Sequence, residues 1–514
     1  MSSHLKAFIV VFIVSAAVLF FFRKPFAELV SGKRYDMWRN VWIAVTVCVF
    51  LIPNYWLFIL LAGMGALALS WAEPVKPSVF FLLLFSVPAI GAAIPGFAGI
   101  NKFVDVTPQT AYTLLFLMPA MFAATHMKKL SRVGGGADLF FLLWLVLQIV
   151  LCLRGPTFTH ILRTMIEEFI VLAPFYYVFS RYPKSLSDIR IMSGAYLLPV
   201  LILSAISIPE FIRSWHFYTS VTTGWFGQLP FTYTIREGLL RAYASVFDPI
   251  AWGYVAMTGV GVGLAFMNER FSLLYKSAGF ALLMAGVLVS LSRGPWVGVV
   301  VTIAVFVLIS PKTTLRMAQL GSVSLIAGLM SLATPYGQKI LGLLPFIGDN
   351  AGDTISYRQR LLDAAGEVMM ESPLFGSSEY LQHPKLQALR QGQGIIDIVN
   401  SYLQVGLKSG FVGLVLFLGV FACALLALRK AMRSARRHDP TLALYCRAYF
   451  ATLIGILVTI FTTSSVFQIP MVYWCFAGVA IALARIEKHQ STQEDSSLPA
   501  EVKTTINSDQ FAWK

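Results

Sequence analysis

Residues 38–71 read WRNVWIAVTVCVFLIPNYWLFILLAGMGALALSW, and this stretch decides the class of fold. From Val41 onward it is apolar except for one interruption, at Pro53 and Asn54. An apolar run of about 17–25 residues can cross the hydrocarbon core of a bilayer as a helix. The Pro-Asn pair therefore predicts a tight hairpin between two membrane helices, on the outer side of the membrane.

The whole chain has the composition of a membrane protein. Its 514 residues are 57% hydrophobic and only 13% charged, with a mean hydropathy of +0.72. A soluble domain carries about 25% charged residues. In lipid every backbone amide needs a partner within its own segment, and these runs lack the alternation of barrel strands. The sequence therefore predicts an all-α, polytopic membrane bundle of about 12–15 spans with a large, partly helical outer loop.

Apolar runs that could each form a span recur to the end of the chain. The first run has no small-residue cleavage site and is followed by Arg23 and Lys24, so we expect a retained span rather than a cleaved signal. The five cysteines lie in apolar runs without metal-ligand spacing, which is typical of small buried hydrophobic residues. The expected spans lie near residues 5–22, 38–52, 55–71, 79–94, 109–125, 138–153, 166–180, 191–207, 249–266, 276–291, 295–310, 317–333, 405–428, 441–463 and 467–485.

The net charge of +15 comes largely from short clusters of Lys and Arg between the spans. Such clusters follow the positive-inside rule, so we place these loops in the cytoplasm. This distribution leaves no argument for a nucleic-acid partner. The largest cluster lies within residues 429–437 and contains Arg429, Lys430, Arg433, Arg436 and Arg437.

Two longer polar segments, residues 208–248 and 334–400, interrupt the series of apolar spans. Both are expected on the outer face of the membrane. Positive residues are disfavoured in short outer loops, so arginines found there imply a partner. That partner is either a neighbouring carboxylate or an anionic substrate. The chain thus divides into N-terminal helices (1–207), an outer loop with aromatics and arginines (208–248), central helices (249–333), a large outer loop (334–400), C-terminal helices (401–485) and a disordered cytoplasmic tail (486–514).

The large outer loop contains one helical pattern around Arg358. Apolar residues at i+4, i+7 and i+11 from Arg358 predict a helix that ends before Pro373. We expect its apolar face to rest on the membrane domain and to hold Arg358 near the outer mouth of the bundle. Arg360 lies roughly 200° around the same helix from Arg358 and is expected to face away from the outer mouth of the bundle. The apolar positions are Leu362, Ala365 and Met369.

The stretch from Ile395 to Leu428 is too long for one span and is expected to split within residues 406–410. Its first part carries polar residues at helical spacing, and Asn400 and Tyr402 flank them. Polar residues that enter a membrane in register line a cavity or form a polar interfacial helix. The polar positions are Asp397, Ser401, Gln404 and Lys408.

Four short motifs follow one another between about residues 240 and 420. They are Arg241-Ala-Tyr-Ala-Ser-Val-Phe-Asp248-Pro249, Ser292-Arg293-Gly294, Arg358 with Pro373-Leu-Phe-Gly376, and Asn400-Ser-Tyr-Leu with Gly410-Phe-Val-Gly413. In this order they resemble the bacterial O-antigen ligase and polymerase superfamily. Its members are inner-membrane glycosyltransferases that act on undecaprenyl-diphosphate-linked glycans. The resemblance implies an active site that faces the periplasm.

The chain departs from the family pattern at two positions. The family often has His directly before the Asn, where this chain has Val399, and Ser378 stands where the family has a second Gly. In ligases that His is implicated in activating the acceptor. Its absence favours a polymerase for exopolysaccharide, capsule or O-antigen over a ligase that transfers glycan to lipid A core. Two alternatives come from other functional classes. One is a transporter or flippase of lipid-linked oligosaccharides, and the other is a scaffold protein of an envelope assembly complex.

The resemblance and the chemistry of arginine indicate the same catalytic residues. Glycosyl transfer from a lipid diphosphate needs cations that hold the leaving diphosphate, and a guanidinium does so as a bidentate donor that stays charged. We expect Arg241, Arg293 and Arg358 in this role and Asp397 as the base for the acceptor. Arg293 could instead form a structural ion pair with Asp248. Further candidates for substrate binding are Arg360, Asp248, Asn400 and Tyr402.

No cofactor or metal is expected. The chain has no Gly-rich phosphate loop, and its histidines are never paired at ligand spacing. The expected partners are the undecaprenyl-diphosphate-linked glycan and the bilayer, with a chain-length regulator and export machinery as protein partners.

Overall fold

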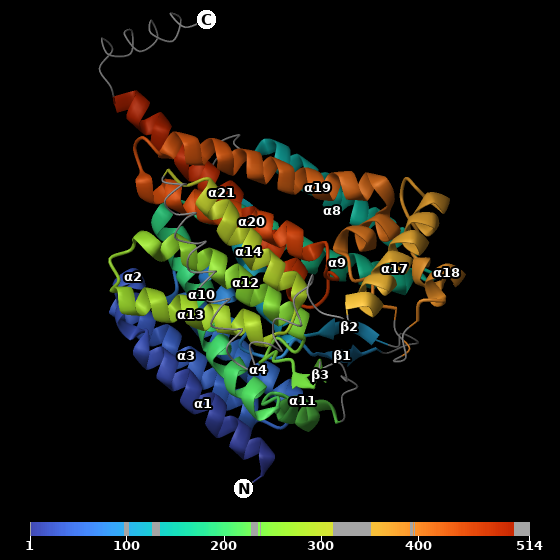
Figure 1. Cartoon of the computed structure of the whole chain (residues 1–514), viewed down its shortest axis with the longest axis horizontal. Helices are drawn as coiled ribbons and strands as arrows, with labels where there is room; N and C mark the ends of the chain where they lie inside the picture. Colours follow the sequence, from blue (N-terminus) through green and yellow to red (C-terminus); the bar gives the residue numbers. More distant parts are fainter. Residues whose placement is uncertain are drawn as a thin grey trace, which may run out of the picture.

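The computed structural model of the chain describes residues 2–96, 102–125, 134–227, 235–236, 238–311, 351–390, 394 and 396–497. Helices dominate these residues, and they pack side by side into one bundle (Figure 1). The expected all-α polytopic bundle is confirmed. The expected span at 317–333 and the first part of the large outer loop, 334–350, lie outside the described residues.

Seven of the described helices are long and apolar enough to cross a membrane. Three shorter apolar helices accompany them and begin or end near the site described below. The long helices are α1 (Ser3–Phe21), α4 (Tyr55–Ala72), α8 (Gly135–Leu151), α10 (Leu186–Arg213), α19 (Ser401–Ala435), α20 (Pro440–Ile460) and α21 (Ile469–Ser497); the shorter ones are α12 (Pro249–Ala265), α13 (Leu273–Val289) and α14 (Arg293–Leu308).

The remaining helices connect or cover these spans. Two of the longer ones are α3 (Gly32–Leu51) and α9 (Phe158–Arg181). The others are α2 (Arg23–Val30), α5 (Lys76–Leu83), α6 (Pro108–Tyr112), α7 (Met118–Thr125), α11 (Thr219–Phe226), α17 (Ala351–Glu371) and α18 (Pro384–Gln387), together with a π-helix at Thr113–Leu117 and 3-10 turns at Cys152–Arg154, Phe266–Asn268 and Tyr380–Gln382.

The core of the bundle lies around α10, α12, α20 and α21. Residues of α10 and α21 are mostly buried, whereas α1 and α8 expose most of their surface and lie at the periphery. Helices α14 and α20 approach closely because small residues face each other. A Cβ at Gly298 would lie 2.1 Å from Oγ1 of Thr459, and one at Gly455 would lie 1.9 Å from Oγ1 of Thr302. Small residues of this kind allow membrane helices to pack backbone against backbone.

The predicted hairpin between residues 38 and 71 is present. Helix α3 ends at Leu51, and α4 begins at Tyr55. The side chain of Asn54 caps α4 by accepting a hydrogen bond of 3.0 Å from the amide of Leu57, which satisfies one of the free amides at the helix start.

The expected span at 79–94 is wrong. Helix α5 ends at Leu83, and the chain turns into strand β1 (Ala92–Pro95), which pairs antiparallel with β2 (Lys102–Val106). Two residues mark the local change: Pro88 has no amide hydrogen to donate to a helix, and at Gly91 a Cβ would lie 2.3 Å from the carbonyl oxygen of Val106. A second small hairpin joins β3 (Ile235–Arg236) to β4 (Leu239–Leu240). The sequence predicted neither hairpin.

Two expected boundaries also shift. Helix α10 continues through Arg213, so the loop that was expected to begin at residue 208 begins only after Arg213. Helix α21 continues to Ser497, within the expected disordered tail. Aromatic residues of the 208–248 segment pack onto the bundle: Phe217 and Tyr218 are fully buried, and the indole of Trp225 donates to the carbonyl of Ile52 at 2.9 Å. The segment is therefore a cap that packs on the spans.

Candidate active site

Helix α17 carries Arg358 to the end of the bundle where α12, α14 and α19 begin (Figure 1). Its buried face consists of Leu361, Ala365 and Val368. These residues pack against Leu386, Ile398 and Leu407 in a small core of their own. Arg358 lies one turn before Leu361, so it is on this face and points toward the bundle. The predicted helix ends before Pro373 as expected, but Leu362, expected on the buried face, is 51% exposed.

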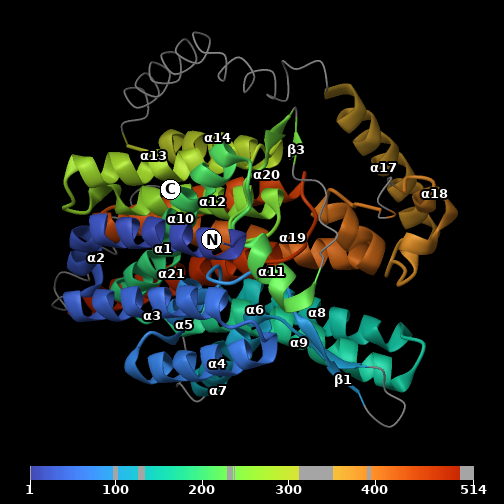
Figure 2. The ribbon, with the colours of Figure 1, turned by 90° about the horizontal axis from the view of Figure 1, so that it is seen from below.

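Figure 2 shows α17, α18 and α19 on the same side of the molecule. A break in α19 anchors the turn that follows α17. Gly410 has φ of 67° and interrupts the helix, which confirms the predicted split. The amide of Phe411 donates to the carbonyl of Pro373 at 2.7 Å, and the amide of Ser377 donates to that of Leu407 at 2.9 Å. A Cβ at Gly410 would lie 2.3 Å from the backbone of Leu374. The residue at the break must therefore be glycine, both for its positive φ and for the space.

The Arg241 loop is held by a residue that sequence reasoning missed. Glu210, near the end of α10, is 0% exposed. Its carboxylate accepts hydrogen bonds from the amides of Phe217 at 3.1 Å, Tyr243 at 3.3 Å and Ala244 at 2.9 Å. The only signal in the sequence was a lone acid at the end of an apolar run, where an ionisable residue needs a partner. Here its hydrogen-bond partners are backbone amides, and Nδ1 of His216 lies 3.7 Å from its Oε2.

The strained backbone of the loop explains why it needs this anchor. Ala244 and Phe247 have φ of 48° and 68°, in the left-handed region that side chains rarely adopt. The anchored loop directs Arg241 onto the Ser292-Arg293-Gly294 turn. Its Nη2 donates to Oγ of Ser292 at 2.8 Å, and its Nε donates to the carbonyl of Ser290 at 3.3 Å. The Arg241 motif and the Ser292-Arg293-Gly294 motif, about fifty residues apart in the chain, thus lie against each other.

The Ser292-Arg293-Gly294 turn opens α14 and packs against the segment between α20 and α21. Oγ of Ser292 donates to the carbonyl of Pro249 at 3.0 Å, which ties the turn to the start of α12. A Cβ at Gly294 would lie 2.2 Å from Oγ1 of Thr462. The same Thr462 offers its carbonyl to Nη2 of Arg358 at 3.4 Å. The turn and α17 therefore meet at one residue.

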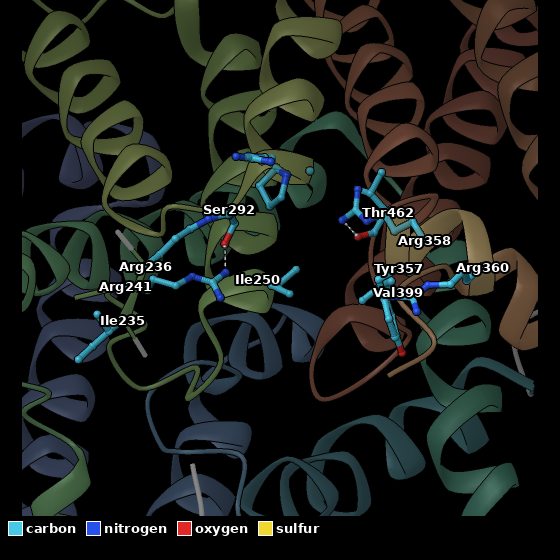
Figure 3. A pocket seen from close by; sticks show the side chains of 13 residues that line it. Ile235, Arg236, Arg241, Ile250, Ser292, Tyr357, Arg358, Arg360, Val399 and Thr462 are labelled. Atoms are coloured by element: carbon cyan, nitrogen blue, oxygen red, sulfur yellow. Dashed lines mark hydrogen bonds between the residues drawn. The ribbon is translucent and has the colours of Figure 1, made fainter. Parts of the chain in front are cut away.

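These elements enclose a cavity of about 520 Å³ (Figure 3). Figure 3 shows Arg241 with Ser292 on one side of it and Arg358 with Thr462 on the other. The structure therefore brings together the three arginines that the sequence selected. The lining includes five arginines: Arg236, Arg241, Arg293, Arg358 and Arg360.

Two of these five differ from expectation. Arg360 was expected to face away, but it lines the same cavity, because a long flexible side chain can reach around its helix. Arg236 was not selected at all. It lies on β3, and its Nη1 donates to the carbonyl of Leu291 at 3.0 Å. The hairpin that places it had no recognisable sequence pattern.

The described lining of the cavity is rich in positive charge. No carboxylate is among its described lining residues. Burial lowers the pKa of Arg358, and the neighbouring charge of Arg293 lowers it further. Burial also lowers the pKa of Arg241, opposed by Asp248. Nε of Arg358 is buried without a hydrogen-bond partner among the described residues. A buried donor on a charged group is costly without an acceptor, so this arrangement favours an anionic ligand.

The two acidic candidates lie beside the cavity and not in its described lining. Asp248 caps α12: its Oδ1 accepts from the amide of Ala251 at 2.7 Å. Asp397 accepts from Oγ of Ser464 at 2.7 Å, and its backbone carbonyl accepts from the hydroxyl of Tyr357 at 3.1 Å. Burial raises the pKa of Asp397, while Ser464 and the charge of Arg358 oppose the shift. Asp397 is thus electrostatically linked to Arg358.

Asn400 and Tyr402 have structural contacts. Asn400 caps α19 by accepting from the amides of Tyr402 and Leu403, and the hydroxyl of Tyr402 donates to the carbonyl of Leu457 at 2.7 Å. Neither residue is in the described lining of the cavity. Both fix the position of the chain next to Val399, and Val399 does line the cavity.

The predicted polar stripe faces protein neighbours. Its residues bond to the segment between α20 and α21 and to α9. Ser401 donates to the carbonyl of Thr463 at 2.7 Å, Gln404 accepts from the amide of Ser465 at 2.9 Å, and Lys408 forms an ion pair with Glu168.

Comparison with known proteins agrees with this geometry. A family model described as O-Antigen ligase matches residues 278–418. The matched region contains Arg293, Arg358 and Arg360, whereas Arg241 precedes it. No curated protein matches the chain. The predicted resemblance to the O-antigen ligase and polymerase superfamily is confirmed: residues 278–418 of this multi-pass membrane protein are similar to the O-Antigen ligase family model.

Proposed function

We propose that this protein is a polysaccharide polymerase of the bacterial inner membrane that joins undecaprenyl-diphosphate-linked repeat units on the periplasmic face. The observation that carries the proposal is the cavity lined by five arginines without a carboxylate in its described lining. A lipid-linked diphosphate carries clustered negative charge. Guanidinium groups bind such oxygens with paired, charge-assisted hydrogen bonds.

The reaction needs this charge most as the leaving group departs. The bond between the donor sugar carbon and the diphosphate oxygen breaks, and the diphosphate leaves with the electron pair. The acceptor hydroxyl oxygen forms the new glycosidic bond, and its proton passes to a base. Cations fixed in place before the reaction stabilise the charge that grows on the diphosphate. We assign this task to Arg241 and Arg293 on one wall and to Arg358 and Arg360 on the other, with Arg236 at the side of Arg241.

Asp397 is the proposed base for the acceptor hydroxyl. A base must be ionised to accept a proton, so turnover should fall as pH drops through the pKa of Asp397, which burial raises. We expect Asp397→Asn to lower kcat by roughly 100-fold or more, a typical contribution of general base catalysis, and to remove the acidic limb of the pH–rate profile. An unchanged acidic limb in this variant would contradict the assignment. Asp363→Asn, on the same outer segment, is the control.

Val399 supports a polymerase over a ligase. It occupies the position at which ligases of the superfamily often have His, and it lines the cavity. An isopropyl group there cannot assist the acceptor by proton transfer. The two functions are separated by supplying purified protein with lipid-linked repeat units alone or together with lipid A core. A polymerase lengthens the glycan in the first mixture; a ligase forms product only in the second.

The arginine lining also predicts the energy source. Cleavage of the bond between the donor sugar and the diphosphate drives transfer, and the cations neutralise the leaving group. Polymerisation by the purified protein is therefore expected to proceed without ATP and in the presence of EDTA. Loss of turnover on chelation, with recovery on adding one divalent ion, would contradict the arginine mechanism and would direct attention to Asp248 and Asp397.

The Lys and Arg distribution predicts the orientation of the chain. A reporter fused near Ala388 should behave as periplasmic, and one fused near Ser434 should behave as cytoplasmic. The opposite result would place the arginine cavity on the wrong side of the membrane for a periplasmic polymerase.

A further inference from the structure

A second basic pocket lies at the other end of the bundle. It has a volume of about 410 Å³ and lies between the end of α14, the end of α19 and Phe450 of α20. Helix α14 begins at Arg293 in the arginine cavity and ends at Leu308 in this pocket. At 1.5 Å per residue its 16 residues separate the two by about 24 Å. The pocket is therefore a separate site, at the opposite membrane surface.

Three arginines of α19 line this pocket: Arg429, Arg433 and Arg436. Their spacing of i, i+4 and i+7 puts them on one face of the helix. The described lining contains no acidic residue. Arg436 donates to the carbonyl of Ile309 at 2.6 Å, which fixes the end of α19 against α14. In the described part of the chain, neither Arg429 nor Arg433 forms a hydrogen bond or an ion pair.

In the turns of α19 that precede these arginines, the same face of the helix is apolar and exposed. Val415, Leu418 and Leu426 are all exposed, and so is Ala422 between them. With Ala422 the series reaches Arg429 and Arg433 in steps of three and four residues, which keeps all of them on one face of the helix. In a membrane helix an exposed apolar stripe contacts lipid chains. The stripe therefore leads from the hydrocarbon region directly to a cluster of guanidinium groups. This is the geometry of one phospholipid molecule, with its chains along the stripe and its phosphate in the pocket.

We propose that this pocket binds the headgroup of an anionic phospholipid from the leaflet opposite the arginine cavity. Arg429 and Arg433 hold the phosphate, and the stripe of Val415, Leu418 and Leu426 holds an acyl chain. Basic pockets between membrane helices bind phosphate-bearing headgroups in this way, and paired guanidinium donors match phosphate oxygens. Binding there would connect the ends of α14 and α19, two helices that also begin beside the arginine cavity.

The test uses two variants that each remove two positive charges from the same end of α19. Arg429→Gln/Arg433→Gln changes the pocket and leaves the Arg436 contact intact. Lys430→Gln/Arg437→Gln changes residues outside the described lining. Purified full-length proteins are titrated with phosphatidylglycerol or with phosphatidylcholine of the same chains, and bound lipid is counted by native mass spectrometry. Melting temperature in zwitterionic detergent confirms that each variant is folded.

We expect the wild-type protein and the Lys430/Arg437 variant to retain phosphatidylglycerol in preference to phosphatidylcholine. The Arg429/Arg433 variant should bind phosphatidylglycerol about ten-fold or more weakly, because two charge-assisted contacts to the phosphate are lost. Equal weakening in both variants would overturn the proposal, since it would show a diffuse surface charge. Equal retention of both lipids would also overturn it. Competition by inorganic phosphate at lipid-like concentrations would identify a free-phosphate site and overturn the lipid assignment.

Discussion

Replacing Arg358 with lysine should reduce polymerisation by about 10- to 100-fold, although the positive charge is kept. A lysine ammonium is a point charge and cannot reproduce the planar, bidentate fork of a guanidinium on a diphosphate. The loss corresponds to about one charge-assisted hydrogen bond in the transition state. Arg358→Ala removes the charge as well. We expect a loss of roughly 1,000-fold or more, because a single arginine at a transferring phosphoryl group contributes this much in other enzymes.

The structure explains why Arg358 should be so sensitive. Its Nη2 contacts the carbonyl of Thr462 at 3.4 Å, and its Nε is buried without a partner among the described residues. The side chain is thus held at the cavity wall with a donor still available for substrate. Polymerisation of purified lipid-linked repeat units measures the effect, with melting temperature as the check on folding.

Arg390→Lys is the matched control for Arg358→Lys. Arg390 lies in the same outer segment but is exposed, and its guanidinium bonds to Gln387 and to the carbonyl of Gly394. Its replacement should leave polymerisation unchanged. If Arg358→Lys retained wild-type turnover, Arg358 would contribute only diffuse charge or structure, and the diphosphate assignment would be wrong.

Glu210→Ala should both destabilise the protein and abolish polymerisation, although Glu210 is not a lining residue of the cavity. The substitution leaves the buried amides of Phe217, Tyr243 and Ala244 without their acceptor. Each such loss costs about 1–3 kcal/mol. The Arg241 loop would then relax from its strained backbone and carry Arg241 away from Ser292. Glu210→Gln, which keeps one acceptor oxygen, should have an intermediate effect.

A double-mutant comparison separates this positioning role from a purely structural one. If Glu210 acts by placing Arg241, then Arg241→Ala should lower turnover much less in the Glu210→Gln protein than in the wild type, because effects of coupled residues are not additive. Simple additivity would mean that Glu210 supports the fold without directing Arg241. Glu367→Ala is the control for loss of a carboxylate. Glu367 is exposed and pairs with Lys385 on the surface, and such surface pairs contribute little to stability.

The segments around Arg358 and Gly410 show where local patterns predict structure. The helix around Arg358 and the break at Gly410 were both predicted, because each depends on the order of apolar residues, Pro and Gly in a short stretch. The face of that helix was predicted less well. Leu361 is buried and Leu362 is exposed, since the surface that α17 meets is formed by residues 386–407 and fixes its rotation. The pattern within α17 contains no information about that surface.

The sequence by itself determined the class of fold and the residues with cationic chemistry. Long apolar runs have one stable backbone arrangement in lipid, the helix, and arginine keeps its charge and its donor geometry wherever it lies. Only the tertiary structure decided which arginines share a cavity, adding Arg236 and Arg360. It alone revealed Glu210 as the anchor of the Arg241 loop. The reason is physical: the contact of Arg236 with Leu291 spans 55 positions of the chain, that of Arg358 with Thr462 spans 104, and that of Glu210 with Ala244 spans 34. Spacing along the sequence does not encode such distances.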